Sequence, residues 1–321
     1  MTHLSICSRE SIRGAALSLR AGHLVAFPTE TVYGLGADAS NPDAISQIYG
    51  AKGRPADHPL IVHISSIVAM DHWAQDISEY AITLARDFWP GPLTLVLKRS
   101  SAAKNFITGG QETVGVRVPA HPVALALLEE FKALHGFGIA APSANRFGAV
   151  SPTTAEAVEE ELGAHLLPDD LILDGGHSLV GVESTIVDCT GPTPMILRLG
   201  AITPLMIEES TGLVALESNP AAIRVSGSLE SHYSPKAKVI LDVIAEPGDG
   251  LIAPDQIPTP NGVIRLAAPS SIEEYARVLY QALRAADKRG LKAVVVLQPG
   301  GDGLAAAIRD RLQRSAWSAE S

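Results

Sequence analysis

Cysteine is scarce in this sequence: Cys7 and Cys189 are the only two among 321 residues, and they form no C-x-x-C pair. This excludes a disulfide framework and a zinc knuckle, and it is typical of a reducing compartment. Apolar runs of about 18 residues are also missing, so we expect no transmembrane helix. Charged residues are spread through residues 1–22, unlike the layout of a signal peptide. We therefore expect a soluble, cytoplasmic protein.

Positive charge is in short supply as well. Lys and Arg number 25 against 35 Asp and Glu, which gives a formal net charge of −10. Proteins that bind nucleic acids usually present a basic face, because phosphate contacts dominate their affinity. We therefore expect little direct RNA binding, with any contact weak or made through a partner. A local basic pocket for a small anion is still compatible with this total.

The common nucleotide-binding and hydrolase motifs are absent. The sequence contains no G-x-x-x-x-G-K-[ST], G-x-G-x-x-G, H-E-x-x-H or G-x-S-x-G pattern, and no His/Asp cluster with metal-ligand spacing. Residues 299–303, PGGDG, superficially resemble a phosphate loop, but their spacing favours a plain strand-to-helix turn. We predict no protein-bound metal site.

The composition, 46% hydrophobic and 19% charged, is that of a globular protein. Short apolar runs alternate with amphipathic segments, as in an α/β domain. Residues 212–235 lack this periodicity, and the strand–helix pattern then restarts in a form compatible with a parallel sheet. We predict a large domain at 1–210, a linker at 211–236 and a small α/β domain at 237–321. The predicted helices are 11–20, from 42 onward, 77–88, 122–134, 154–162, 204–210, 272–288 and 304–313. The predicted strands are 23–27, 60–64, 93–97, 114–118, 138–141, 171–173, 184–188, 195–199, 239–243, 262–265 and 293–296.

Two early segments carry unusual chemistry. Residues 27–36, FPTETVYGLG, follow a predicted strand and either form a turn with a capping threonine or present hydroxyl and N–H groups to a small polar ligand. Lys52 and Arg54 follow a predicted helix, so they either complement its dipole or grip triphosphate oxygens. His63 ends an apolar run, where a histidine is more often part of the core than a ligand.

Later segments add an arginine and several small polar residues. Arg117 lies in a predicted strand, where a buried charge is costly unless it is paired, either with a protein carboxylate or with that of a substrate. Residues 140–145, AAPSAN, could approach phosphates closely. Ser151 and Thr153 are expected to cap helix 154–162, whose N-terminus also favours anions. Two predicted adjacent strands should bring Ser184 and Arg198 together.

Taken together, these segments resemble the YrdC family of threonylcarbamoyl-AMP synthases, and most closely its long form with an extra C-terminal domain. PTETVYGLG, K-x-R-P with HPLIVH, PGPLTLVL, VGVRVPAHP, APSAN with SPT, GVESTIVD and ILRLG occur in the family's order, and HYSP follows. The resemblance covers essentially the whole chain. It implies a twisted mixed-sheet YrdC-like domain followed by a small Rossmann-like α/β domain.

The resemblance also implies an activity: a nucleotidyltransferase that converts L-threonine, bicarbonate and ATP to threonylcarbamoyl-AMP and pyrophosphate. The product would serve the threonylcarbamoyl-adenosine modification of tRNA through a downstream transferase complex. Mg²⁺ would accompany ATP. By resemblance, the catalytic residues would be Lys52 and Arg54; the L-threonine site Thr31, His63, Arg117, Ala141 and Ser184; the ATP site Arg54, His58, Thr113, Ser143, Asn145, Ser151 and Arg198; and a linker gate His232 and Tyr233. His58 stands where the family more usually has asparagine.

Three other functions compete with this one. The fold could serve an RNA-binding protein, which the net charge disfavours. It could belong to a carbamoyl-transfer domain of hydrogenase maturation, but those proteins carry zinc-binding cysteines. It could be a non-catalytic regulatory relative, which the joint presence of Lys52, Arg54, Ser143 and Asn145 disfavours. The linker could likewise be a passive tether instead of a gate.

Overall fold

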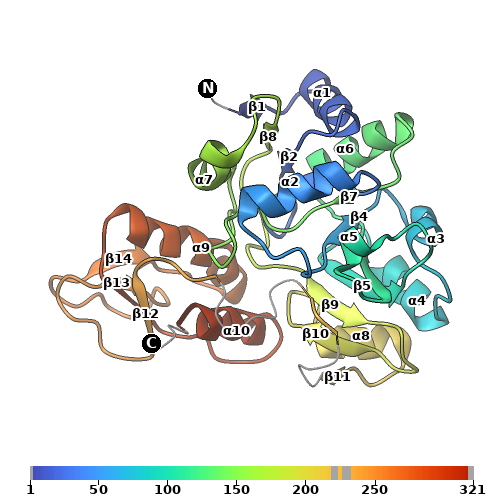
Figure 1. Cartoon of the computed structure of the whole chain (residues 1–321). Helices are drawn as coiled ribbons and strands as arrows, with labels where there is room; N and C mark the ends of the chain where they lie inside the picture. The colour runs from blue at the N-terminus through green and yellow to red at the C-terminus, as the bar shows by residue number, and fades with distance from the viewer. Residues whose placement is uncertain (1–2, 218–222, 226–232, 317–321) are drawn as a thin grey trace.

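The computed structural model describes residues 3–217, 223–225 and 233–316. Two sheets organise the chain, a large mixed one and a small parallel one (Figure 1). We call residues 3–217 the N-terminal part and residues 233–316 the C-terminal part. Within these ranges, no helix combines the length and the apolar character that a bilayer span requires.

The large sheet has eleven strands in the order β1-β8-β2-β3-β7-β4-β6-β5-β9-β10-β11. Their bounds are β1 (Leu4–Ile6), β2 (Val25–Phe27), β3 (Gly34–Asp38), β4 (Ile61–His63), β5 (Leu93–Lys98), β6 (Thr113–Arg117), β7 (Ile139–Ala140), β8 (Leu171–Asp174), β9 (Thr185–Asp188), β10 (Met195–Arg198) and β11 (Leu216–Glu217). The α-helices of this part are α1 (Arg9–Arg20), α2 (Pro42–Lys52), α3 (Met70–Trp73), α4 (Glu79–Phe88), α5 (Asn105–Thr108), α6 (Pro122–Ala133), α7 (Ala155–Leu162) and α8 (Pro204–Thr211).

Helices cover both faces of the large sheet. Successive residues of a strand point to opposite faces, and β2 shows the result. Val25 and Phe27 pack in a cluster with α1 and α6, whereas Leu24 and Ala26 pack with α2 and α7. The sheet is therefore the middle layer of three, which agrees with the predicted α/β class.

Local signals fix the helix that leads into the pocket. Asn41 caps α2 by accepting hydrogen bonds from the backbone N–H groups of Asp43 at 3.0 Å and Ala44 at 3.2 Å, and Pro42 fills the first turn. Gly53 then ends the helix in the left-handed region, at φ 61°. This turn redirects the chain, so that Arg54 reaches the pocket described below.

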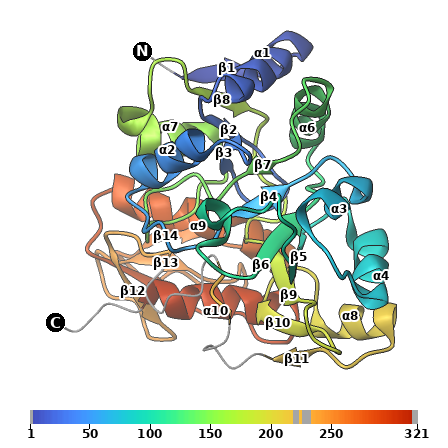
Figure 2. The same ribbon diagram turned by 45° about the vertical axis from the view of Figure 1, so that its right-hand side comes forward.

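The C-terminal part is a parallel sheet with two helices, as the sequence predicted. β12 (Lys238–Leu241), β15 (Ala293–Val296), β13 (Gly250–Ile252) and β14 (Ile264–Ala267) pair in that order, all parallel, with α9 (Ile272–Lys288) and α10 (Leu304–Ala316). Their core is not separate from the first part. Val32, Val150 and Val182 of the N-terminal part belong to the same buried cluster as side chains of α9 and α10. In both ribbon views the C-terminal part lies against the N-terminal part (Figures 1 and 2).

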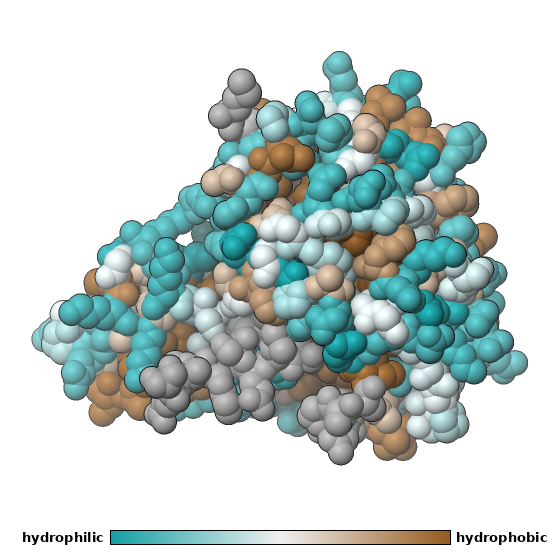
Figure 3. Space-filling model, viewed as in Figure 1, coloured by the Kyte–Doolittle hydropathy of each residue, from teal (hydrophilic) through white to brown (hydrophobic). Residues whose placement is uncertain are grey.

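The outer surface is ordinary for a globular protein. Hydrophilic residues cover much of the face in Figure 3, and hydrophobic residues form smaller groups between them.

Three sequence expectations need comment. β1, β3 and β13 were not predicted, and β11 falls inside the stretch predicted as linker, where it pairs with β10. The caps predicted for α7 were wrong, because the helix begins one residue later and Thr154 accepts the hydrogen bond from the N–H of Ala157 at 3.2 Å. The domain limits at 210 and 236 stay a prediction.

Candidate functional site

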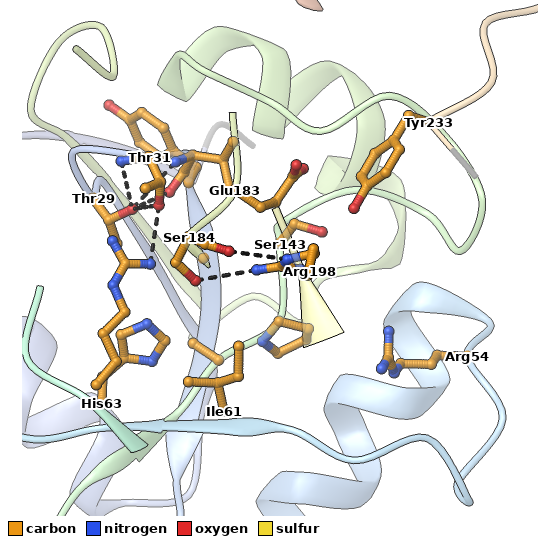
Figure 4. Close-up of a pocket in the computed structure, with 16 residues that line it drawn as sticks. Thr29, Thr31, Arg54, Ile61, His63, Ser143, Glu183, Ser184, Arg198 and Tyr233 are labelled. Carbon is orange, nitrogen blue, oxygen red and sulfur yellow. Dashed lines mark hydrogen bonds between the residues drawn. The ribbon is translucent and has the colours of Figure 1, made fainter. Parts of the chain in front are cut away.

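One pocket collects most of the residues that the sequence singled out (Figure 4). Its wall is formed by the loop after β2, the ends of β4 and β6, the loop after β7, the loop before β9 and the end of β10. Arg54 and Tyr233 complete it. The predicted site residues in the wall are Thr31, Arg54, His63, Ala141, Arg117, Ser143, Ser184, Arg198 and Tyr233.

A buried hydrogen-bond network forms one end of the pocket. Arg117 donates from Nη2 to the Glu30 carboxylate at 2.6 Å, from Nη1 to the Thr31 hydroxyl at 3.0 Å and from Nε to the Gly91 carbonyl at 3.2 Å. Thr31 and Thr29 share a hydrogen bond of 2.8 Å between their hydroxyls. The protein carboxylate considered for Arg117 is therefore present. Since each terminal nitrogen of a guanidinium carries two hydrogens, Nη1 and Nη2 each keep a second donor.

His63 lies beside this network and packs edge-on against Phe27, with ring centroids 5.9 Å apart. Its Nδ1 atom is buried and has no hydrogen-bond partner within the described residues. Burial, and then the charge of Arg117, lowers the pKa of His63 to about 3. The imidazole is therefore neutral at physiological pH. It can accept a hydrogen bond, but it holds a proton too weakly for an efficient general base.

Two arginines form the other end. Arg198 donates to the Ser184 carbonyl at 3.0 Å and to its hydroxyl at 3.1 Å, which confirms the predicted approach of these two residues. Ser184 also shares a hydrogen bond of 2.8 Å with the hydroxyl of Thr94. Arg54 donates to the Pro59 carbonyl at 3.1 Å. Burial lowers the pKa of Arg54 to about 10, so it stays charged at neutral pH. This end therefore attracts an anion.

Lys52 does not reach the wall of the pocket. Its ammonium is buried and donates to the carbonyl of Ser143 at 2.6 Å and to that of Asn145. Burial, and then the charge of Arg54, holds the pKa of Lys52 well below its usual value. In this structure Lys52 fastens the loop that carries Ser143, and its direct contact with phosphates stays a prediction.

Four predicted ATP residues also lie outside this wall. Asn145 donates to backbone carbonyls of its own loop. Ser151 donates to Glu183 at 2.7 Å. His58 packs edge-on against Phe147, with ring centroids 5.3 Å apart. Thr113 lies at the opposite end of β6 from Arg117 and lines a neighbouring pocket with residues 223–225. The structure therefore leaves their contact with ATP as a prediction.

The predicted gate is described only in part. His232 lies outside the described residues. Tyr233 lines the pocket, is 1% exposed and stacks on Tyr280 of α9 at a centroid distance of 5.7 Å. The Arg311 guanidinium lies 5.5 Å from the centre of the Tyr233 ring. A residue of the C-terminal part thus forms one side of the pocket.

Comparison with known families decides between the competing functions. The family model Sua5_yciO_yrdC, described as "Telomere recombination", matches residues 18–200, and the model "Threonylcarbamoyl-AMP synthase, C-terminal domain" matches residues 202–317. The chain belongs to the threonylcarbamoyl-AMP synthase family.

Individual threonylcarbamoyl-AMP synthases match over almost the whole chain. The enzyme of that name from Pyrococcus abyssi is 40% identical over 95% of this chain and 93% of its own. That from Bacillus subtilis is 38% identical, over 95% of this chain and 92% of its own. The crystal structure of P. abyssi Sua5 complexed with L-threonine superposes with a TM-score of 0.87 at 38% identity, covering 98% of this chain and 96% of that one.

Sequence reasoning missed two carboxylates of this threonylcarbamoyl-AMP synthase family member. Glu30 pairs with Arg117, and Glu183 lines the pocket at 5% exposure. Both lie in motifs given above, PTETVYGLG and GVESTIVD. In each motif the residue that was predicted to bind substrate is the next one, Thr31 or Ser184. The available signal was that each is a charged residue beside apolar strands, where a partner is required.

Proposed function

We propose that the chain synthesises threonylcarbamoyl-AMP from L-threonine, bicarbonate and ATP, acting as a nucleotidyltransferase that supplies tRNA modification. The family membership supports this function, as does one observation: a single pocket is lined by Arg117 and Thr31 and also by Arg198 and Arg54, and Arg54 lies across from Thr31 (Figure 4). Such a pocket suits an amino acid beside a polyanion. The free donors of Arg117 would take the threonine carboxylate, with the Thr31 and Ser184 hydroxyls near its side chain.

The chemistry requires no covalent enzyme intermediate. The deprotonated amine of threonine attacks the carbon of bicarbonate, from which a C–O bond breaks and water leaves, or the carbon of CO2 formed when bicarbonate loses water. In the CO2 route the nitrogen then gives a proton to solvent, and the product of either route is the carbamate N-carboxy-threonine. A carbamate oxygen then attacks the α-phosphorus of ATP, and the bond to pyrophosphate breaks. The residues of the pocket would position both substrates and offset phosphate charge, as is usual in phosphoryl transfer.

Mg²⁺ fits this pocket only as a companion of the nucleotide. No group of three or more His, Cys, Asp or Glu residues that could hold a metal occurs in the described ranges, and Glu183, the carboxylate in the wall, is engaged by Arg311. Mg²⁺ commonly keeps several waters and binds through substrate phosphates. When bound there, it would neutralise phosphate charge.

Threonylcarbamoyl-AMP is a reactive adenylate, so a second enzyme should use it as its substrate. We propose that a downstream transferase complex takes the threonylcarbamoyl group to tRNA, with little direct RNA contact by this chain. A filter-binding assay against tRNA should show weak binding that falls steeply with salt.

Substrate choice tests the proposed function. With ATP, Mg²⁺ and bicarbonate, pyrophosphate release should be rapid with L-threonine and at least about a hundredfold slower with valine. A site built to bond a hydroxyl rejects the analogue that lacks it, because its own polar groups are left unpaired. Omitting bicarbonate is the control and should abolish release. Equal rates with the two amino acids would contradict the proposal.

A further inference from the structure

A buried polar cluster joins the pocket to the C-terminal part of the chain. The Glu183 carboxylate accepts hydrogen bonds from the Ser151 hydroxyl at 2.7 Å, the Tyr280 hydroxyl at 2.9 Å and Nε of Arg311 at 2.8 Å. Tyr280 lies on α9 and Arg311 on α10. A carboxylate in the wall of the pocket thus takes two of these three hydrogen bonds from the C-terminal part.

Arg311 is 0% exposed, and each of the three nitrogens of its guanidinium donates a hydrogen bond. Besides Glu183, it donates from Nη2 to the Leu199 carbonyl at 2.8 Å and from Nη1 to Asp310. Leu199 directly follows Arg198. A buried ion pair is weak evidence for a gain in stability, because apolar residues of similar volume often serve equally well. The position of the pair at the pocket therefore invites a functional explanation.

The charge of Glu183 is opposite to that of every other permanently charged side chain in the wall. Arg54, Arg117 and Arg198 are cationic, and an unpaired carboxylate among them would repel a triphosphate. Burial acts to raise the pKa of Glu183, but the charges of Arg311 and Arg198 outweigh burial and bring it to about 2. The carboxylate therefore stays ionised at neutral pH, and only a paired cation can neutralise it.

We propose that Arg311 is a positioning residue for the nucleotide: it neutralises Glu183 and holds the chain beside Arg198. The C-terminal part would thereby supply a charge on which ATP binding in the N-terminal part depends. This inference rests on the proposed function, because it takes ATP as the ligand.

The test measures nucleotide binding separately from turnover. In Arg311→Met, the affinity for a non-hydrolysable ATP analogue with Mg²⁺, measured by calorimetry, should fall at least about tenfold, while threonine affinity changes less than about twofold. Adding Glu183→Gln to Arg311→Met removes the stranded anion and should restore most of the affinity. A purely structural role of Arg311 would lower threonine affinity together with nucleotide affinity, because the stranded buried charge would disturb the whole pocket. Either that joint loss, or a double variant that binds the analogue as weakly as Arg311→Met, would overturn the proposal.

Arg284→Met is the matched control. Arg284 on α9 also joins the two parts, through Glu161 at 3.1 Å and the Val150 carbonyl, but Glu161 does not line the pocket. Its loss should leave nucleotide affinity unchanged. An equal loss in this variant would mean that any disturbance between the parts suffices, and would overturn the role of Arg311.

Should Arg311→Met fail to fold, Glu183→Gln alone decides. It removes an anion while Arg311 stays, so nucleotide affinity should rise; no gain, or a loss, would contradict the proposal. A wild-type protein that binds the analogue but releases no pyrophosphate with threonine would count against the proposed function alone.

Discussion

The three arginines of the pocket differ in whether a carboxylate holds them. Arg117 has the Glu30 carboxylate, whereas Arg198 and Arg54 have serine and proline carbonyls among their acceptors. Alanine at position 117 would leave Glu30 buried without its cation, at a cost of about 3–5 kcal/mol. Lysine at this position keeps the positive charge that Glu30 requires but loses the planar guanidinium that can bind a carboxylate through two hydrogen bonds. The lysine variant therefore tests substrate binding without stranding Glu30.

Arg117→Lys should raise the KM for threonine about ten- to a hundredfold with little effect on that for ATP, and Arg54→Lys should do the reverse. A hydrogen bond to a charged group contributes about 1.5–3 kcal/mol, which sets this range. Pyrophosphate release at varied concentrations of each substrate gives both constants. Arg99→Lys is the control, because neither Arg99 nor its partner Glu112 lines the pocket. If the two pocket variants raised both constants alike, the separate assignments would be wrong.

The residue types of the site were predictable, but their partners were not. Cations, hydroxyls and small side chains in short motifs pointed to Thr31, Arg54 and Arg198. The engagement of Lys52 by carbonyls more than 90 positions away depends on how a distant loop turns. The local sequence indicates that Glu183 needs a partner but cannot identify it, since its ion-pair partner Arg311 comes 128 positions later.

At the scale of elements, the sequence predicted helices better than short strands. Helix caps such as Asn41 and Gly53 depend on neighbouring residues only, so they can be recognised in the sequence. β3 was missed because glycines at 34 and 36 suggest a turn. A Cβ at Gly36 would lie 2.8 Å from the Phe27 ring and 2.7 Å from Ile139. Glycine is therefore required here by close packing against neighbouring strands, and the sequence of β3 alone does not show which strands those are.

Gly181 governs how closely the loop before β9 approaches α9. It has a φ of +81°, and a Cβ there would lie 2.4 Å from the Ala276 carbonyl oxygen. Gly181→Ala should destabilise the protein by more than about 2 kcal/mol in urea unfolding and weaken nucleotide binding, since strain adds to a backbone clash. Gly176→Ala is matched, with φ +82° and open space, and should cost only the strain, about 1–2 kcal/mol. Equal losses would show that the approach of α9 is unimportant.

For the whole molecule, the two parts share one buried cluster, so the C-terminal part is more than an appendage. A chain ending after Glu217 keeps α8 and β11, but it loses Tyr233 and Arg311. Threonine should still bind, because Arg117 and Thr31 lie within the N-terminal part, whereas pyrophosphate release should fall at least about tenfold. Calorimetric titration measures threonine binding, and the pyrophosphate assay measures turnover. A truncated chain as active as the full one, with the same product lifetime, would reduce the linker and the C-terminal part to a tether.

Val32, Val150 and Val182 also bear on how such proteins evolve. Their side chains are buried in one cluster with side chains of the C-terminal part. In a lineage that lost the last hundred residues, these three positions would meet water, and selection would replace valine with small or polar side chains. In a lineage that gained the C-terminal part, selection would instead replace small or polar side chains at these positions with valine. The three positions should therefore change together in a family tree, and reading them alone should tell whether an ancestor carried one part or two.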